Sequence, residues 1–242
     1  MIFELLKGLT YVFKGFTLLG SKGIRPFVVV PLLINIVLFS IAIWFISHQL
    51  EAVMTHLLPS WLSWLKWLLW PIFAIVFFFI IFYTFSIIAN IIAAPFNAIL
   101  SERIENKLKG LPIPEFQGYK SIPKLIAKTF KSEAQKLLYM AKWFILLLIV
   151  TIIPAINIIS PAAWIIFGSW LIAIEYLDYP MGNHELYFKE ELLILRKNRL
   201  IALGFGWGIA ILTSVPFFNF LAMPIGVSGA TALWVDKLSA TN

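Results

Sequence analysis

Four long stretches of the chain contain no Asp, Glu, Lys or Arg, and their hydrophobic residues do not alternate with polar ones. These stretches are residues 26–50, 67–101, 143–174 and 200–235. Each is longer than the roughly 18 apolar residues that mark a candidate membrane segment. A soluble helix of this length would carry a polar face. The pattern therefore predicts an all-α integral membrane protein.

The residues before the first stretch have a different pattern. Residues 2–19 place five apolar side chains on one face of a helix and keep the charged ones off it; the five are Leu5, Leu9, Val12, Phe13 and Phe16. This pattern predicts that residues 1–22 contain an amphipathic helix lying in the membrane interface. Residues 21–25 then break the helix, and Pro26 is suited to open the next one because the first helical position needs no backbone donor.

The first two stretches predict two long transmembrane helices within residues 26–100, at about 26–46 and 70–100. The second is longer than one crossing needs, so it is expected to tilt or to project beyond the bilayer. Residues 47–66 are expected to connect the two on the far side. Tryptophans at the membrane surface form aromatic belts, and four of them cluster here: Trp61, Trp64, Trp67 and Trp70.

The last two stretches share an internal repeat, which is Pro-x-x-Asn followed by a further proline. The residues are Pro154, Asn157 and Pro161 in the first, and Pro216, Asn219 and Pro224 in the second. The apolar arm before the first break, 143–153, is only 11 residues long, or about 17 Å of helix. We therefore predict two half-inserted (re-entrant) helical hairpins, at 143–174 and 200–235. Broken helices at membrane depth indicate a transport path.

Composition and charge refine this interpretation. The chain is 61% hydrophobic and 13% charged, contains no cysteine and carries a net charge of +7. Its basic residues flank the apolar runs, so they indicate membrane topology rather than nucleic-acid binding. Residues 101–142 hold nine Lys or Arg against four acidic residues, which predicts a basic extramembrane helical segment. We treat residues 1–242 as a single multi-pass membrane domain.

The first candidate site is Gly23-Ile24-Arg25, immediately before a membrane helix. A helix N-terminus offers unpaired N–H groups and a partial positive charge, and an arginine fork matches a tetrahedral oxyanion. The alternative is that the cations near this helix end extend to lipid headgroups.

Polar residues on the two long helices form a second set of candidates. Asn90 and Asn97 are two turns apart on one face, and Asn35 lies on the other helix. They suit a pore lining or, equally, hydrogen bonding between helices. Glu102 and Arg103 suit a pore mouth or a solvated helix end.

Asp178 and His184 lie in a polar segment between the two hairpins. A metal site needs more ligands with suitable spacing, and the other histidines, His48 and His56, belong to the opposite face. There is no nucleophile elbow and no His-Glu-x-x-His motif. A structural turn is the favoured interpretation, so we expect no catalytic residue, no metal, no cofactor and no enzyme. An intramembrane enzyme using these two residues is the weaker alternative.

Several motifs in order resemble the bacterial CysZ sulfate-permease family, within the wider group of EI24-like membrane proteins. The resemblance runs from about Gly15 to Asp236. It is carried by Gly23–Arg25 with Pro31–Asn35; Ala89-Asn90 with Ala93–Asn97 and Glu102; Asp178–Pro180 with Asn183-His184; and Met223-Pro224 with Gly229–Thr231 and Trp234-Val235.

This resemblance implies sulfate uptake across the bacterial inner membrane for cysteine biosynthesis, without an ATPase partner. It also implies two long membrane helices, two half-inserted hairpins and a homo-oligomer of antiparallel protomers. The family's anion-binding motif falls on Gly23, Ile24 and Arg25. Pro26 departs from the family, because a residue with an N–H is common at that position. No proton or sodium site is evident, so a passive, channel-like path is favoured.

One competing function remains open from the sequence. The basic segment 101–142 and the amphipathic residues 2–19 would equally suit a non-conducting scaffold that binds anionic lipid or protein partners.

Overall fold

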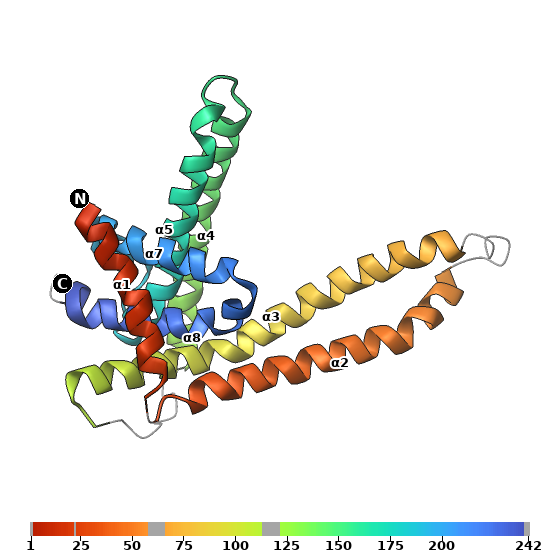
Figure 1. Ribbon diagram of the computed structural model, residues 1–242, viewed down its shortest axis with the longest axis horizontal. Helices are drawn as coiled ribbons and strands as arrows, with labels where there is room; N and C mark the ends of the chain where they lie inside the picture. Colours follow the sequence, from red (N-terminus) through yellow and green to blue (C-terminus); the bar gives the residue numbers. More distant parts are fainter. Residues whose placement is uncertain (1, 22, 58–65, 113–121, 240–242) are drawn as a thin grey trace. The chain divides into compact units, whose positions relative to one another are not determined.

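The computed structural model describes residues 2–21, 23–57, 66–112 and 122–239, and these residues are almost entirely helical (Figure 1). The helices are α1 (Ile2–Leu19), α2 (Pro26–Leu57), α3 (Lys66–Lys109), α4 (Ile122–Ile152), α5 (Ser160–Asn183), α6 (Phe188–Lys197), α7 (Arg199–Ser214) and α8 (Pro216–Leu233). A short 3-10 turn, Asn157–Ile159, precedes α5, and a π-helical turn, Trp234–Leu238, follows α8. The all-α prediction is confirmed.

Three segments among the described residues are long and apolar enough to cross a membrane. They are Val28–Phe45 in α2, Lys131–Ile152 in α4, and Asn157–Asn183, which includes α5. In α3 the described apolar stretch is Trp70–Ile81, within a helix of 44 residues. The protein is therefore a helical membrane protein.

The chain divides into two compact units. Residues Val29–Phe96, which are most of α2 and the first part of α3, form one unit; Met1–Val28 with Asn97–Asn242 forms the other. Within the first unit, α2 and α3 run in opposite directions in Figure 1. Most large side chains of its described part are exposed, as Val37 and Ile80 are at 55% and 56%, which is the surface expected of helices that face lipid.

The core of the larger unit is built where α1 and α5 pack against α7 and α8. Close approach between these helices depends on glycine. A Cβ added to Gly15 would overlap the carbonyl oxygen of Ile225, and one added to Gly204 would overlap that of Leu5. Small residues let membrane helices approach closely and gain van der Waals contacts.

Helix α1 has the predicted bounds, and the face that it turns to the core is rich in glycine. Its buried residues are Gly8, Tyr11, Val12 and Gly15, whereas Phe13 and Phe16 are 73% and 52% exposed. Of the predicted apolar face, Val12 is buried, whereas these two phenylalanines lie outside the core. The glycines of α1 let its backbone approach the neighbouring helices closely, and the larger aromatic side chains remain outside the core.

The predicted breaks in the two last apolar stretches are confirmed. Helix α4 ends at Ile152 before Pro154, and α7 ends at Ser214 before Pro216 opens α8. Pro224 does not break a helix, because it lies inside α8. The helix entering the first hairpin is also longer than the 11 apolar residues counted in the sequence, since α4 runs for 31 residues.

The two long helices begin close to the predicted positions but extend further. Helix α2 starts at Pro26 as expected and continues to Leu57, and α3 already begins at Lys66. Trp67 and Trp70 of the predicted aromatic belt lie in its first turns, with exposures of 74% and 51%. Trp61 and Trp64 lie outside the described residues.

Candidate functional site

The chain turns sharply between α1 and α2. The Ser21 N–H donates to the Leu18 carbonyl at 3.1 Å, and the Ile24 N–H donates to the Ser21 carbonyl at 3.3 Å. Gly23 has φ +87°, in the left-handed region that side chains with a Cβ rarely adopt. A glycine at this position is therefore explained by the geometry of the turn.

Ile24 fixes this turn to the larger unit. Its side chain is 2% exposed and belongs to a buried cluster with Leu100 and Ile104 of α3 and Val227 of α8. In Gly23–Arg25 the middle residue thus serves as an apolar anchor. Its two neighbours remain at the surface, where Gly23 and Arg25 are both exposed.

The guanidinium of Arg25 is available to a ligand from solution. One nitrogen, Nη2, donates to the carbonyl of Gly20 at 3.2 Å. Among the described residues, no carboxylate lies within ion-pair distance of this side chain. Arg25 directly precedes the first residue of α2, where Pro26 has no N–H and the Val28 N–H donates to the Arg25 carbonyl at 3.1 Å; the helix end therefore contributes mainly its partial positive charge. Cation and helix N-terminus together suit an oxyanion.

The other candidate residues are distributed over both units. Asn35 is half-buried in α2, and Asn90 lies in α3 with its side chain outside the described residues. Asn97 is 4% exposed, and its Nδ2 has no hydrogen-bond acceptor among the described residues. Glu102 is exposed and Arg103 is half-buried. Buried amides without full partners are rare in proteins, which makes Asn97 the most informative of these positions.

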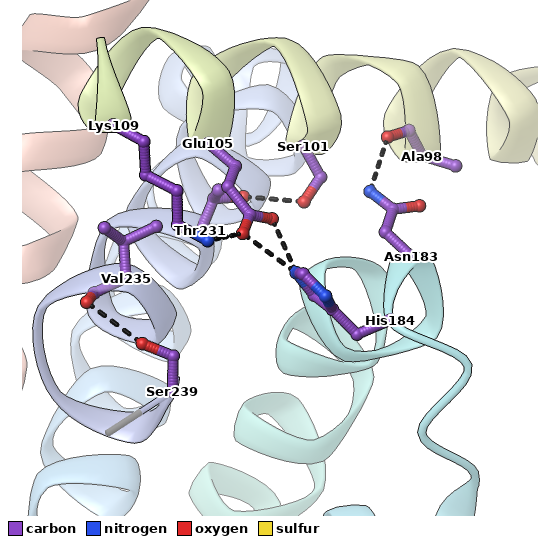
Figure 2. A network of polar contacts seen from close by, with 9 residues as sticks. All are labelled: Ala98, Ser101, Glu105, Lys109, Asn183, His184, Thr231, Val235 and Ser239. Atoms are coloured by element: carbon purple, nitrogen blue, oxygen red, sulfur yellow. Dashed lines mark hydrogen bonds and ion pairs between the residues drawn. The ribbon is translucent and has the colours of Figure 1, made fainter. Parts of the chain in front are cut away.

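The ion network at the end of α3 centres on Glu105, which sequence analysis missed (Figure 2). This residue is 6% exposed, and its carboxylate lies 2.8 and 2.9 Å from Nε2 of His184. Lys109, one turn further along α3, lies 2.5 Å from it. The i, i+4 spacing of Glu105 and Lys109 was the available signal. Beside this network, the buried hydroxyls of Ser101 and Thr231 are 2.8 Å apart.

A second ion network joins α4, α5 and the start of α6. Lys136 of α4 is 5% exposed, and its Nζ lies 3.0 Å from Glu133, 3.4 Å from Glu175 and 3.0 Å from Asp178. The N–H of Phe188, the first residue of α6, donates to the Ser132 hydroxyl at 2.8 Å. These contacts fix the base of the first hairpin to α6.

Glu191 lies beside this second network without an ion pair of its own. It is 1% exposed, and neither carboxyl oxygen reaches a hydrogen-bond partner within the described part of the chain. Burial, followed by the negative charge of Asp178, raises the pKa of Glu191 well above its usual range, although Lys136 opposes the shift. A neutral carboxyl here avoids the cost of a buried, unpaired charge.

The structure does not bring Asp178 and His184 together. Asp178 pairs with Lys136, whereas His184 pairs with Glu105. Asn183, next to His184, donates through Nδ2 to the Ala98 carbonyl at 3.0 Å. No group of three or more metal-ligating side chains occurs among the described residues. Both residues serve as links between helices, as a structural turn requires.

These features define a helical membrane protein whose first spanning segment begins at a cation-bearing turn. Residues 11–224 match the family described as sulfate transporter CysZ/etoposide-induced protein 2.4. The protein is 43% identical to the sulfate transporter CysZ of Pectobacterium atrosepticum, over 97% of this chain and 87% of that one. It is 42% identical to the sulfate transporter CysZ of Salmonella typhimurium, over 95% of this chain and 92% of that one. It is 39% identical to the sulfate transporter CysZ of Pseudomonas fluorescens, over 98% of this chain and 96% of that one. The chain belongs to the sulfate transporter CysZ/etoposide-induced protein 2.4 family.

Proposed function

We propose that the protein is a channel-like permease that carries sulfate across the bacterial inner membrane and supplies it for cysteine biosynthesis. Relatives at about the same length are named sulfate transporters. The observation that carries the proposal is the exposed Arg25 at the start of α2, held in place by the buried Ile24.

The proposed sulfate site is the turn of Gly23, Ile24 and Arg25. Sulfate is a dianion, so fixed donors and at least one cation must replace the water that it loses. Arg25 supplies the cation, and the adjoining helix N-terminus supplies partial positive charge. Pro26 carries no N–H, so the site relies on the guanidinium more than on the backbone of that position.

The proposed path continues along polar side chains of α2 and α3. Asn35, Asn90 and Asn97 would line it, and Glu102 and Arg103 would lie at its inner mouth. The amide of Asn97 supports this role, because its buried Nδ2 has no acceptor among the described residues. Binding along such a path must stay weak enough for release, which favours passive conduction without an ATPase partner.

The proposed membrane arrangement has two spanning helices, two half-inserted hairpins and an interfacial α1. The uncharged arm that enters the first hairpin supports half-insertion. Lys142 is the last charged residue before this arm, and α4 ends at Ile152. From Lys142 to Ile152 the helix rises about 15 Å, less than a full crossing.

The proposed assembly is a homo-oligomer of antiparallel protomers, surrounded by lipid. The exposed apolar surfaces of α2 and α3 support an association of protomers within the bilayer. The exposed Phe3, Leu6, Phe13 and Phe16 of α1 support its position at the interface.

Uptake of radiolabelled sulfate into liposomes that contain only the purified protein tests this function. We expect saturable uptake above that of empty liposomes, with chloride and phosphate competing weakly. Folded protein that gives no uptake would contradict the proposal and would leave a non-conducting scaffold as the function.

A further inference from the structure

A groove in the larger unit lies away from the Gly23–Arg25 turn. It has a volume of about 520 Å³ and is formed by α4, α5 and the junction of α6 with α7. Aromatic side chains form much of its wall, including Tyr139 and Trp143 of α4 and Phe167 and Trp170 of α5. The helices that form this wall belong to candidate membrane spans, so in a membrane lipid is present around them.

Two arginines also line the groove. Arg196 lies in the last turn of α6, and Arg199 is the first residue of α7. Both are exposed, and within the described ranges neither forms an ion pair. Asn198 is both the C-cap of α6 and the N-cap of α7, so the opposite ends of the two helix dipoles offset each other there. The two guanidinium groups are therefore the feature of the groove that suits an anion.

We propose that this groove binds an anionic phospholipid, with the phosphate between Arg196 and Arg199 and an acyl chain along the aromatic wall. Two guanidinium groups match the oxygens of a phosphate. Basic pockets between membrane helices are suited to anionic lipid headgroups. The inference goes beyond sulfate transport and does not depend on it.

The apolar wall distinguishes a lipid from a free anion. Sulfate or inorganic phosphate would contact the arginines but would leave the wall of the groove uncovered. An acyl chain covers that wall, and burial of apolar surface contributes to its binding.

Native mass spectrometry of the full-length protein in detergent tests this site. The probes are phosphatidylglycerol and phosphatidylcholine with identical acyl chains, offered in equal amounts. We expect the wild type to retain phosphatidylglycerol preferentially. The double variant Arg196→Gln/Arg199→Gln should bind it about tenfold more weakly, because two charge-assisted hydrogen-bond donors are lost.

Two further variants make the result specific. Lys189→Gln/Lys197→Gln removes the same charge from exposed positions of α6 that do not line the groove, and it should bind phosphatidylglycerol like the wild type. Ala163→Phe places a ring in the apolar part while both arginines remain; it should reduce lipid binding without weakening the headgroup contacts.

Three results would overturn the proposal. Equal retention of the two lipids would show that the arginines do not select charge. Equal loss of binding in the lysine variant would show a general charge effect. Displacement of the lipid by millimolar sulfate, together with unchanged binding by Ala163→Phe, would assign the arginines to a free anion.

Discussion

His184 and Glu105 connect the end of α5 to α3 through a paired contact, in which Nε2 of the histidine lies 2.8 and 2.9 Å from the two carboxylate oxygens. The carboxylate is nearly inaccessible to solvent, whereas the imidazole side chain is 41% exposed. Lys109 approaches the same carboxylate from within α3. One acidic side chain thus contacts both a histidine and a lysine beside the cluster that anchors Ile24.

Replacing this acidic group is expected to loosen the end of α3. Glu105→Gln removes the charge that holds His184 and Lys109, and we expect a loss of about 1–3 kcal/mol in the free energy of unfolding. Thermal unfolding in detergent measures it. Lys107→Gln, on an exposed position of the same helix, is the matched control and should change stability little; equal losses in both variants would contradict a special role for Glu105.

Alanine substitution at two glycines tests whether α5 and α7 pack closely. A Cβ on Gly206 of α7 would overlap the carbonyl oxygen of Ser169 in α5, whereas one on Gly168 meets nothing within 4 Å. Gly206→Ala should therefore destabilise the protein by about 1–3 kcal/mol. Gly168→Ala should be neutral or stabilising, because alanine is the better helix former. Similar unfolding temperatures for the two variants would show that α5 and α7 do not pack as described.

The buried Glu191 predicts a defined dependence of stability on pH. Its pKa in the folded protein is raised by burial and by Asp178, so the protonated form favours the fold. Its contribution is fully present below the pKa of the unfolded chain and is lost as the pH rises from there through the raised folded value.

Glu191→Gln should remove this loss. The variant should resemble the wild type in acid and become more stable than it as the pH rises, as thermal unfolding between acidic and alkaline pH would show. Glu190→Gln, on the exposed neighbouring position, should not have this effect. Destabilisation by Glu191→Gln across the whole range would show that the folded protein requires the charged carboxylate.

Gly23 and Gly110 offer a matched pair for the sulfate site. Both have positive φ, +87° and +65°, and a Cβ on either would meet nothing within 4 Å. Alanine at either position should cost about 1–2 kcal/mol in backbone strain. Only Gly23→Ala should also weaken sulfate binding, since it redirects the turn that presents Arg25. Equal sulfate affinity in the two variants would show that this turn does not bind the anion.

Much of the fold follows from the sequence because membrane helices are long and have clear boundaries. The uncharged runs and the prolines predict the start of α2 at Pro26 and the breaks after α4 and α7. The packing face of α1 was not predictable in the same way. It depends on glycines that approach the backbone of α7 and α8, and hydrophobic periodicity gives no weight to glycine.

In the candidate site, too, some features follow from the sequence and others depend on contacts between distant helices. The residues of the Gly23–Arg25 turn can be selected from sequence, because a glycine and a cation precede a membrane helix. The anchoring role of Ile24 depends on α3 and α8, which are distant in sequence. Glu105 and Glu191 were missed for the same reason: their surroundings come from helices far along the chain, and their spacing alone resembles that of a solvated helix surface.

Sulfate binding by Arg25→Ala tests the central claim most directly. Equilibrium binding of radiolabelled sulfate to purified protein would compare the wild type with Arg25→Ala and with the exposed control Lys107→Ala. We expect Arg25→Ala to bind sulfate at least about tenfold more weakly, because a charge-assisted contact is lost, while its unfolding temperature and the control's affinity stay near those of the wild type. Wild-type affinity in folded Arg25→Ala would contradict the assignment of the sulfate site to this turn.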